Sequence, residues 1–250
     1  MTAAVTRQLV TTFHIGRSGS TVLGDLLGQH PAVTWLGEIY EWPEFRDRPA
    51  PPGPGSELLR RLNTRLPGVT TPVTGIEAKF YHLHDHGIAM AGFLDELGGA
   101  GAGPCRFIVL RRRNYLRKVV SSLAARQRGR WFARPGQAVP PVRLAIDPQR
   151  VCIDGDAQPL VDYLRDWDDQ FAQLDALLAE AGALQLSYED DIEEDPLVAY
   201  RMVCRHLGLE PGAPEVRFHR TTPQPLAEVV TTLDDIRRAL AGTPYEWMAR

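Results

Sequence analysis

Cysteine is scarce in this chain of 250 residues. Its three cysteines, Cys105, Cys152 and Cys204, lie far apart and form no Cys-x-x-Cys pair. Structural zinc sites and disulfide scaffolds are built from closer or more numerous cysteines, so the sequence argues against both. We therefore expect a protein of the reducing cytoplasm.

Long hydrophobic runs are also lacking. No segment approaches the roughly 20 apolar residues that a membrane-spanning helix needs, and the apolar run near the N-terminus is too short for a signal peptide. With 44% hydrophobic residues, the chain can still bury a sizeable core. We expect one domain over residues 1–250 with no membrane span, and the sequence leaves its oligomeric state open, a homodimer included.

Acidic residues are absent from one long stretch. Between Leu97 and Ile146 there is no Asp or Glu but eleven Arg or Lys, although the net charge of the whole chain is only −3. This asymmetry is typical of a local anion site or of a solvated basic face, and charge alone leaves both open. The small net charge and the acidic run from Glu189 to Asp195 argue against nucleic acid as a partner.

Apolar runs alternate along the chain with segments of helical periodicity. This order predicts an α/β fold of the P-loop type, in which helices flank a parallel sheet on both faces. Ligands of such sheets bind at the carboxyl ends of the strands. The expected strands cover residues 9–15, 32–36, 105–110 and 184–188, and the expected helices cover residues 20–30, 114–124, 160–178 and 195–208.

Three further features have structural interpretations. Residues 130–159 are rich in Pro, Gly and Arg with little periodicity, which is typical of a mobile lid or an insertion over a site. The segment from Pro49 to Gly55 is interpreted as an exposed loop. Trp167 and Phe171 fall on the apolar stripe of a long helix, so we interpret them as core residues rather than adenine-stacking residues.

A glycine-rich turn follows the first expected strand, with the sequence Gly16-Arg17-Ser18-Gly19-Ser20-Thr21. Glycines let the backbone come close to an anion, and amides at the helix start and hydroxyls supply donors. The loops of nucleotide hydrolases carry a lysine at the Ser20 position, which is missing here, and the cation stands earlier, at Arg17. No hydrophobic run ending in Asp supplies a second metal ligand. The turn therefore predicts a phosphate site but no metal–triphosphate site.

A basic motif follows the strand expected at residues 105–110. Asn114 suits the N-cap of the next helix, and Asn114, Arg117 and Ser121 would share the helix face turned toward an anion at its N-terminal side. Arg113 begins this motif, and the two arginines before it are interpreted as a positively charged rim. Two phosphate sites at two strand ends suit a nucleotide with phosphates at both its 3′ and 5′ positions.

Both motifs resemble those of the sulfotransferases that use 3′-phosphoadenosine 5′-phosphosulfate (PAPS). The glycine-rich turn resembles their 5′-phosphosulfate loop. The basic motif resembles their 3′-phosphate motif, in which an Arg is followed eight residues later by a Ser, as Arg113 is by Ser121. The chain end is similar to bacterial carbohydrate enzymes of the nodulation-factor and trehalose type, and a Gly-Glu pair at residues 37–38 is similar to tyrosylprotein enzymes. Residues 41–74 and 130–159 lie outside the resemblance.

The resemblance implies an enzyme that moves a sulfuryl group in line from PAPS to a hydroxyl of a sugar-containing or small-molecule acceptor, without a metal. It implies that Arg17 stabilises the leaving oxygen and that Glu38 is the general base. Residues 220–224 are a further candidate contact to the nucleotide. The implied donor-binding residues are Arg17, Ser18, Gly19, Ser20 and Thr21 for the 5′ group, and Arg113 and Ser121 for the 3′ phosphate.

The general base has competing candidates. A carboxylate is a weak base unless desolvation raises its pKa, and apolar neighbours at positions 35, 36, 39, 40 and 42 can supply such surroundings for Glu38. His82, His84 and His86 alternate, would share one face of a strand, and match the histidine base of the cytosolic branch of the family. Lys79 is a candidate for binding the acceptor or assisting the leaving group.

Two other functions stay open. One is a metal-dependent small-molecule kinase with a degenerate phosphate loop, and the other is a nucleotide-binding protein without catalysis. A metal cluster of the three histidines is also conceivable, but the spacing without cysteine partners disfavours it.

Overall fold

The computed structural model describes residues 8–41, 61–62, 64–99 and 105–250. Five strands of the described chain form one sheet in the order β2-β3-β1-β4-β5, and every adjacent pair is parallel. The predicted α/β fold is confirmed. The strands are β1 (Gln8–His14), β2 (Val33–Glu38), β3 (Val73–Lys79), β4 (Cys105–Arg111) and β5 (Leu184–Ser187).

The strand order places β1 in the middle of the sheet, between β3 and β4. The turn after β1 therefore lies between the ends of its two neighbours, Lys79 on β3 and Arg111 on β4. Strand β3 was not expected from the sequence, because a glycine and two charged residues interrupt its hydrophobic pattern. The missed strand is the one that brings Lys79 to the site.

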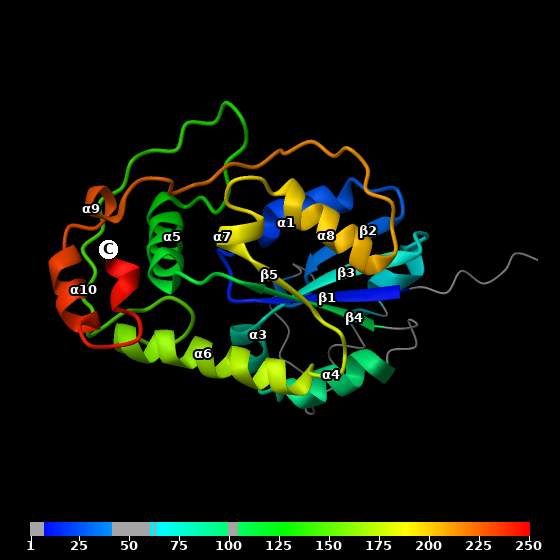
Figure 1. Cartoon of the computed structure of the whole chain (residues 1–250), viewed down its shortest axis with the longest axis horizontal. Coiled ribbons are helices and arrows are strands. Elements are labelled where there is room, and N and C mark those ends of the chain that lie inside the picture. The colour runs from blue at the N-terminus through cyan, green and yellow to red at the C-terminus, as the bar shows by residue number, and fades with distance from the viewer. Residues whose placement is uncertain (1–7, 42–60, 63, 100–104) are drawn as a thin grey trace, which may run out of the picture.

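Helices cover both faces of the sheet (Figure 1). Successive residues of a strand point to opposite faces, so Val10 joins the core under α1 and α8, and Phe13 joins the core on the other face. The predicted flanking of the sheet is confirmed. The first face carries α1 (Ser20–Gly28) and α8 (Leu197–Leu207), and the second core includes α3 (Phe80–Asp85), α4 (Met90–Gly99), α5 (Tyr115–Arg128) and α6 (Leu160–Leu177).

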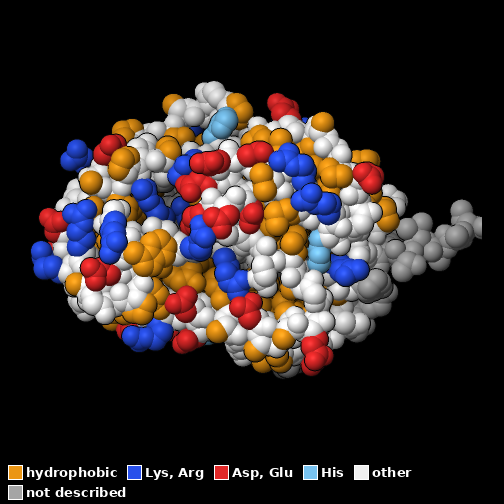
Figure 2. Space-filling view, in the orientation of Figure 1, with side chains coloured by type: hydrophobic (Ala, Val, Ile, Leu, Met, Phe, Trp, Pro, Cys, Tyr) orange, Lys and Arg blue, Asp and Glu red, His pale blue; other side chains and the backbone are white. Residues whose placement is uncertain are grey.

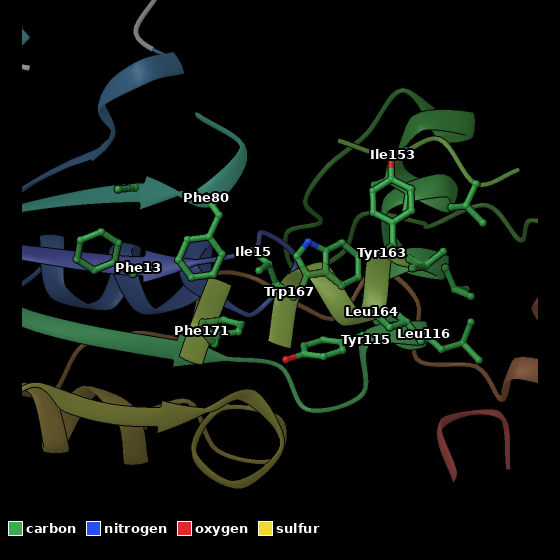
Figure 3. Close-up of a cluster of buried hydrophobic side chains, with 14 of the residues drawn as sticks. Phe13, Ile15, Phe80, Tyr115, Leu116, Ile153, Tyr163, Leu164, Trp167 and Phe171 are labelled. Carbon is green, nitrogen blue, oxygen red and sulfur yellow. Dashed lines mark hydrogen bonds between the residues drawn. The ribbon is translucent and has the colours of Figure 1, made fainter. Parts of the chain in front are cut away.

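Aromatic side chains from α6 fill the larger core (Figure 3). The ring of Phe171 lies 4.8 Å from that of Phe80, edge to face, and the ring of Trp167 lies 5.5 Å from that of Tyr115. Trp167 and Phe171 are 5% and 3% exposed. Their interpretation as core residues is confirmed, since buried rings packed in this way stabilise the fold and leave no face for a ligand.

Helix ends follow the sequence signals. The side chain of Asn114 accepts a hydrogen bond from the backbone N–H of Arg117 over 2.9 Å, as predicted for an N-cap. α5 and α8 end at Gly129 and Gly208, which adopt the left-handed conformation that favours glycine. The shorter described elements are η1 (Ile39–Glu41), η3 (Leu66–Gly68), α7 (Tyr188–Asp191), α9 (Leu226–Val229), α10 (Leu233–Leu240) and η4 (Glu246–Ala249).

Residues 130–159 form no regular helix or strand, but part of the segment belongs to the core. Val142, Leu144 and Ile146 are buried, and the backbone N–H of Leu144 donates to the carbonyl of Val229 over 2.7 Å. Trp131 and Phe132 are about half exposed. The lid over residues 130–159 stays a prediction, although residues 142, 144 and 146 are buried.

Several expectations have no test in this fold. The loop from Pro49 to Gly55 lies outside the described residues, and so does Trp42. The single domain over residues 1–250 and a homodimer stay predictions. Among the helices that the structure describes, none combines the length and the apolar character needed to cross a membrane.

Candidate active site

The turn after β1 has a backbone that few residues tolerate. Gly16, Arg17 and Gly19 have positive φ angles of 76°, 54° and 85°. A Cβ atom on Gly19 would lie 2.8 Å from Cγ2 of Ile192, so glycine is needed for space as well as for conformation. Arg17 holds this conformation without being glycine, which is a strained state typical of functional sites. No side chain caps the N-terminus of α1, which begins after this turn.

A buried hydrogen-bond network lies beneath the turn. The N–H of Gly16 donates to Nδ1 of His14 over 3.0 Å, which places the imidazole proton on Nε2. Nε2 lies 3.0 Å from one oxygen of Glu77, and the indole N–H of Trp35 donates to the other oxygen over 2.7 Å. Burial raises the pKa of Glu77, but the hydrogen bonds from His14 and Trp35 outweigh burial and hold this pKa below its ordinary value.

Two glycines make room for the Trp35 indole. A Cβ atom on Gly24 of α1 would lie 2.4 Å from its Nε1, and one on Gly75 of β3 would lie 2.0 Å from its Cε3. No larger residue fits at either position without moving the ring. The indole is therefore a spacer that sets how closely α1 approaches the sheet.

A cavity of about 440 Å³, which we call the loop cavity, opens beside the turn. The glycine-rich turn and Ser121 of the second predicted anion motif line it, and Nε of Arg17 donates to the hydroxyl of Ser121 on α5 over 3.0 Å. Segments remote in sequence complete the wall, including residues 131–132 and 218–222. The sequence-predicted residues in this wall are Arg17, Gly19, Ser20, Thr21 and Ser121, together with Arg220, Thr221 and Thr222 of the C-terminal candidate segment.

Arg17 is the centre of the loop cavity. Besides Ser121, its guanidinium donates to the hydroxyl of Thr221 over 2.6 Å and to the carbonyl of Trp131. Burial and the neighbouring charge of Arg112 lower the pKa of Arg17 to about 10. Two cations held this close are stabilised by an anion between them, so the cavity suits a negatively charged ligand.

The three successive arginines after β4 have different surroundings. Arg112 is 8% exposed, lines the loop cavity, donates to the carbonyl of Arg17 over 2.6 Å and lies over the ring of Tyr188. Its buried Nε has no hydrogen-bond partner in the described chain. Arg113, the predicted 3′-phosphate ligand, is outside the cavity wall, and its half-exposed guanidinium pairs with Asp190 over 2.5 Å. Arg111 pairs with Asp175 of α6.

The three hydroxyls of the turn also differ in their hydrogen-bond partners and in whether they face the loop cavity. Ser18 is fully buried and donates to the carbonyl of Gly16 over 3.2 Å, so it does not line the cavity. Ser20 is hydrogen-bonded to Glu77, which as a carboxylate can only accept, so the Ser20 proton points away from the cavity. Thr21 is exposed and lines the cavity.

Acidic side chains border the same region. Figure 2 shows Asp and Glu gathered over α7 and the turn after it. Glu193 and Glu194 of this turn line the loop cavity, and Glu193 pairs with Arg220 over 2.5 Å. The charge asymmetry of the sequence is therefore partly cancelled where the basic and acidic segments meet.

A β-bulge turns Glu38 toward α1. Trp35 pairs with Gly75 but Glu38 pairs with Glu77, so β2 contains one extra residue over this interval. Gly37, with a φ of 70°, lies within the bulge. Since side chains alternate along a strand, the extra residue places Glu38 on the same face as Trp35 and Glu77. Without it, Gly37 would take this place.

The carboxylate of Glu38 is 27% exposed and has polar neighbours. It forms an ion pair with Lys79, and Nε2 of His82 lies 4.0 Å away. Lys79 runs along the turn, since its Cε is 3.6 Å from the position of a Cβ on Gly16. The expectation of apolar surroundings was wrong for Ile39 and Tyr40, which turn into the core, while Trp35 lies on the same face as Glu38 and lines the same cavity. Trp42 is outside the described residues.

The three histidines do not share a face. They lie on α3 or at its end, where residues four apart are neighbours, so His82 and His86 both contact Tyr40. The side chain of His84 is 86% exposed, and the strand interpretation was wrong because β3 ends at Lys79. Burial lowers the pKa of His82, while its hydrogen bond is the largest of the causes that lower the pKa of Glu41 to about 2.

Two groups in the described chain have ligand atoms close enough for a metal ion. One comprises His14, Glu38 and Glu77, and the other comprises Glu38, Glu41 and His82. The ammonium of Lys79 already pairs with the carboxylate common to both groups. A divalent ion at either site would therefore lie next to a fixed positive charge.

A second cavity of about 560 Å³, which we call the helix cavity, lies along α1. Thr21 and Phe218 line both cavities, so the two adjoin. Glu38 lines the helix cavity and not the loop cavity. The remaining wall consists of Gly24, Asp25, Gly28, Gln29, Trp35, Gly37, Glu41, Glu77 and Arg217.

The sequence analysis missed a buried ion pair near the site. Lys118 of α5 is 1% exposed, pairs with Asp154 and lies over the ring of Trp167. Burial is the main cause that lowers its pKa to about 8; the charges of Lys79 and Arg17 act in the same direction, and Asp154 opposes them. A lysine between Leu116 and Val120 on an apolar helix face was the available signal.

The chain was compared with known proteins. No family model matches it. Nodulation protein H of Rhizobium tropici is 27% identical over 247 residues, which cover 92% of this chain and 88% of that protein. A solved sulfotransferase from Alicyclobacillus acidocaldarius is 15% identical with a TM-score of 0.47, covering 96% of this chain and 98% of that one. The similarity to sulfotransferases that the two motifs predicted is thus confirmed, along nearly the whole chain.

Proposed function

We propose that this chain is a sulfotransferase that moves the sulfuryl group of PAPS to a hydroxyl of a sugar-containing or small-molecule acceptor. The observation that carries the proposal is the hydrogen bond between Arg17 and Ser121, because it brings a residue of each anion motif into one cavity. A donor with 3′ and 5′ phosphates needs two such sites at a fixed separation. The match to nodulation protein H supports sulfuryl transfer in general.

The donor is proposed to lie in the loop cavity. Backbone amides at the start of α1 and the hydroxyl of Thr21 bind the 5′ group, and Arg17 stabilises the oxygen that leaves sulfur. Arg112 and Ser121 bind the 3′ phosphate, since the buried Nε of Arg112 gains a partner from an anion there. Arg113 stays a prediction from motif spacing. Ser18, Gly19 and Ser20 shape the turn through their backbone and internal hydrogen bonds.

Glu38 is proposed as the general base. The acceptor hydroxyl gives its proton to the Glu38 carboxylate as its oxygen bonds to sulfur, and the bond from sulfur to the phosphate oxygen breaks. The products are the sulfate ester and 3′-phosphoadenosine 5′-phosphate (PAP). Lys79 lies between Glu38 and the turn, where its charge can orient the base and stabilise the leaving group. No step needs a metal.

A metal-dependent kinase is the second candidate, since Glu38, Glu41 and His82 have metal-ligand spacing. The first experiment compares calorimetric binding of PAP and of ATP, each with and without Mg²⁺. We expect tight binding of PAP that Mg²⁺ does not change, and weaker binding of ATP. Preference for ATP with Mg²⁺ would contradict the sulfotransferase proposal, and binding of PAP without turnover of any PAPS would favour a nucleotide-binding protein. Cytoplasmic location stays a prediction.

A further inference from the structure

We propose that the helix cavity holds the acceptor, and that this acceptor carries a positive charge beside its hydroxyls, as an amino sugar does. The inference rests on the proposed function, and it specifies the class of acceptor that the sequence left open. Its three supports are the position of the cavity, the charge of its wall and the place of Glu38.

The position follows from the shared wall. In-line transfer requires the acceptor to approach sulfur from the side opposite the leaving oxygen, so the acceptor needs space that adjoins the donor. The helix cavity meets the loop cavity at Thr21 and Phe218. Glu38 faces it with a partly exposed carboxylate, within reach of an acceptor hydroxyl that lies there.

The wall has an excess of negative charge. Asp25 accepts a hydrogen bond from the amide of Gln29 over 2.9 Å, and Glu77 accepts one from the indole of Trp35 and lies 3.0 Å from Nε2 of His14. With Glu38 and Glu41 they make four carboxylates in the described wall. The one arginine among the described wall residues, Arg217, lies 3.7 Å from Glu215.

This wall selects acceptors by charge. An ammonium group is attracted by the negative charges of Asp25 and of the buried Glu77. Acceptor hydroxyls can donate to the half-buried carboxylate of Asp25, and a carboxylate or phosphate on the acceptor would be repelled. The opposite sign of the loop cavity then keeps donor and acceptor apart, because the anionic donor is repelled from the helix cavity. Charge selection of this kind changes the affinity for the acceptor and not the rate of sulfuryl transfer once the acceptor is bound.

The test measures binding of two hydroxyl-rich probes by calorimetry, with and without saturating PAP. Kanamycin carries several ammonium groups, and trehalose is neutral. We expect kanamycin to bind at least tenfold more tightly than trehalose. Asp25→Asn should weaken kanamycin about fivefold, as expected for one charge a few ångströms from a cation near the surface, while PAP binding stays within twofold.

Glu180→Gln is the matched control, since it removes one exposed charge in the turn after α6, away from both cavities. Equal binding of trehalose and kanamycin, or equal weakening of kanamycin by both variants, would overturn the inference. PAP that fails to bind without Mg²⁺ would overturn the proposed function instead. If PAP binds and kanamycin does not, the failure belongs to the acceptor inference alone.

Discussion

The loop cavity and the helix cavity share Thr21 and Phe218, but their walls differ in charge. Arg17, Arg112 and Arg220 line the first, where Glu193 and Glu194 offset part of their charge. Carboxylates predominate in the second, among them Asp25, Glu38 and Glu77. An anion is attracted by cations, more strongly where these are buried, and a carboxylate can accept a proton from a hydroxyl. In the proposed function, these two tasks belong to different sides of one turn.

Glu38→Gln should give the largest effect, because it is expected to affect turnover and not donor binding. The amide cannot take a proton, so we expect turnover of PAPS to fall by roughly 10²–10⁴-fold, while the Kd for PAP stays within twofold. The measurement pairs initial rates with calorimetry. If turnover were unchanged, the role of base would move to His82, which lies 4.0 Å from Glu38.

Lys118 is a buried cation near both cavities, and the charges of Lys79 and Arg17 contribute to lowering its pKa. Its folded-state pKa of about 8 lies below the ordinary 10.5, so the unfolded state binds more protons between these values, and stability rises with pH over that window. We expect wild type to gain up to about 3 kcal/mol over Lys118→Met between pH 8 and 10.5. Urea unfolding across this range measures it, and parallel pH curves would contradict it.

Arg112→Ala breaks the positive wall. Because a hydrogen bond to a charged group contributes about 1.5–3 kcal/mol, the Kd for PAP should rise roughly 10–100-fold. Binding of adenosine 5′-phosphosulfate, which has no 3′ phosphate, should change less. Arg113→Ala is the matched comparison, and a larger and PAP-selective loss there would assign the 3′ phosphate to Arg113, as the motif spacing predicts.

Trp35→Phe acts on the structure beneath both cavities. It removes the N–H that donates to Glu77 and leaves that buried carboxylate with one partner fewer, at a cost of about 1–3 kcal/mol in the free energy of unfolding. Trp131→Phe, at an exposed position, should change this free energy by less than about 0.5 kcal/mol. Denaturant unfolding compares the two variants, and equal losses would remove the role of the indole N–H.

The hydroxyls of the turn should give the smallest effect. Thr21→Val removes a donor that lines the loop cavity, and we expect PAP binding to weaken by roughly 3–10-fold. Ser20→Ala should weaken PAP binding less, since the Ser20 hydroxyl donates its hydrogen bond to Glu77. The reverse order in calorimetry would show that Ser20 reorients toward the donor.

Most of the fold was predictable because its signals are local. The turn at residues 16–21, the N-cap at Asn114 and the stripe that contains Trp167 each follow from a few neighbouring residues. β3 was missed because its glycine accommodates the ring of Trp35 from another strand. A glycine that is needed because of a contact distant in sequence cannot be recognised from its neighbours in the chain.

The site was predictable to the level of motifs, and less so for individual side chains. Arg112 and Arg113 are adjacent and chemically identical, and only the packing of Tyr188 and the pairing with Asp190 distinguish them. The same holds for Ser18, Ser20 and Thr21, whose hydroxyls differ in partner rather than in type.

The sequence by itself determined that strands alternate with helices, that a glycine-rich turn follows the first strand, and that a basic motif follows β4. These are properties of short segments, which form wherever their dihedral angles and periodicity are satisfied. Only the tertiary structure decided that Arg17 meets Ser121, that the bulge at Gly37 turns Glu38 toward α1, and that Lys79 lies between them. Each depends on the order of strands in the sheet, which no single segment encodes.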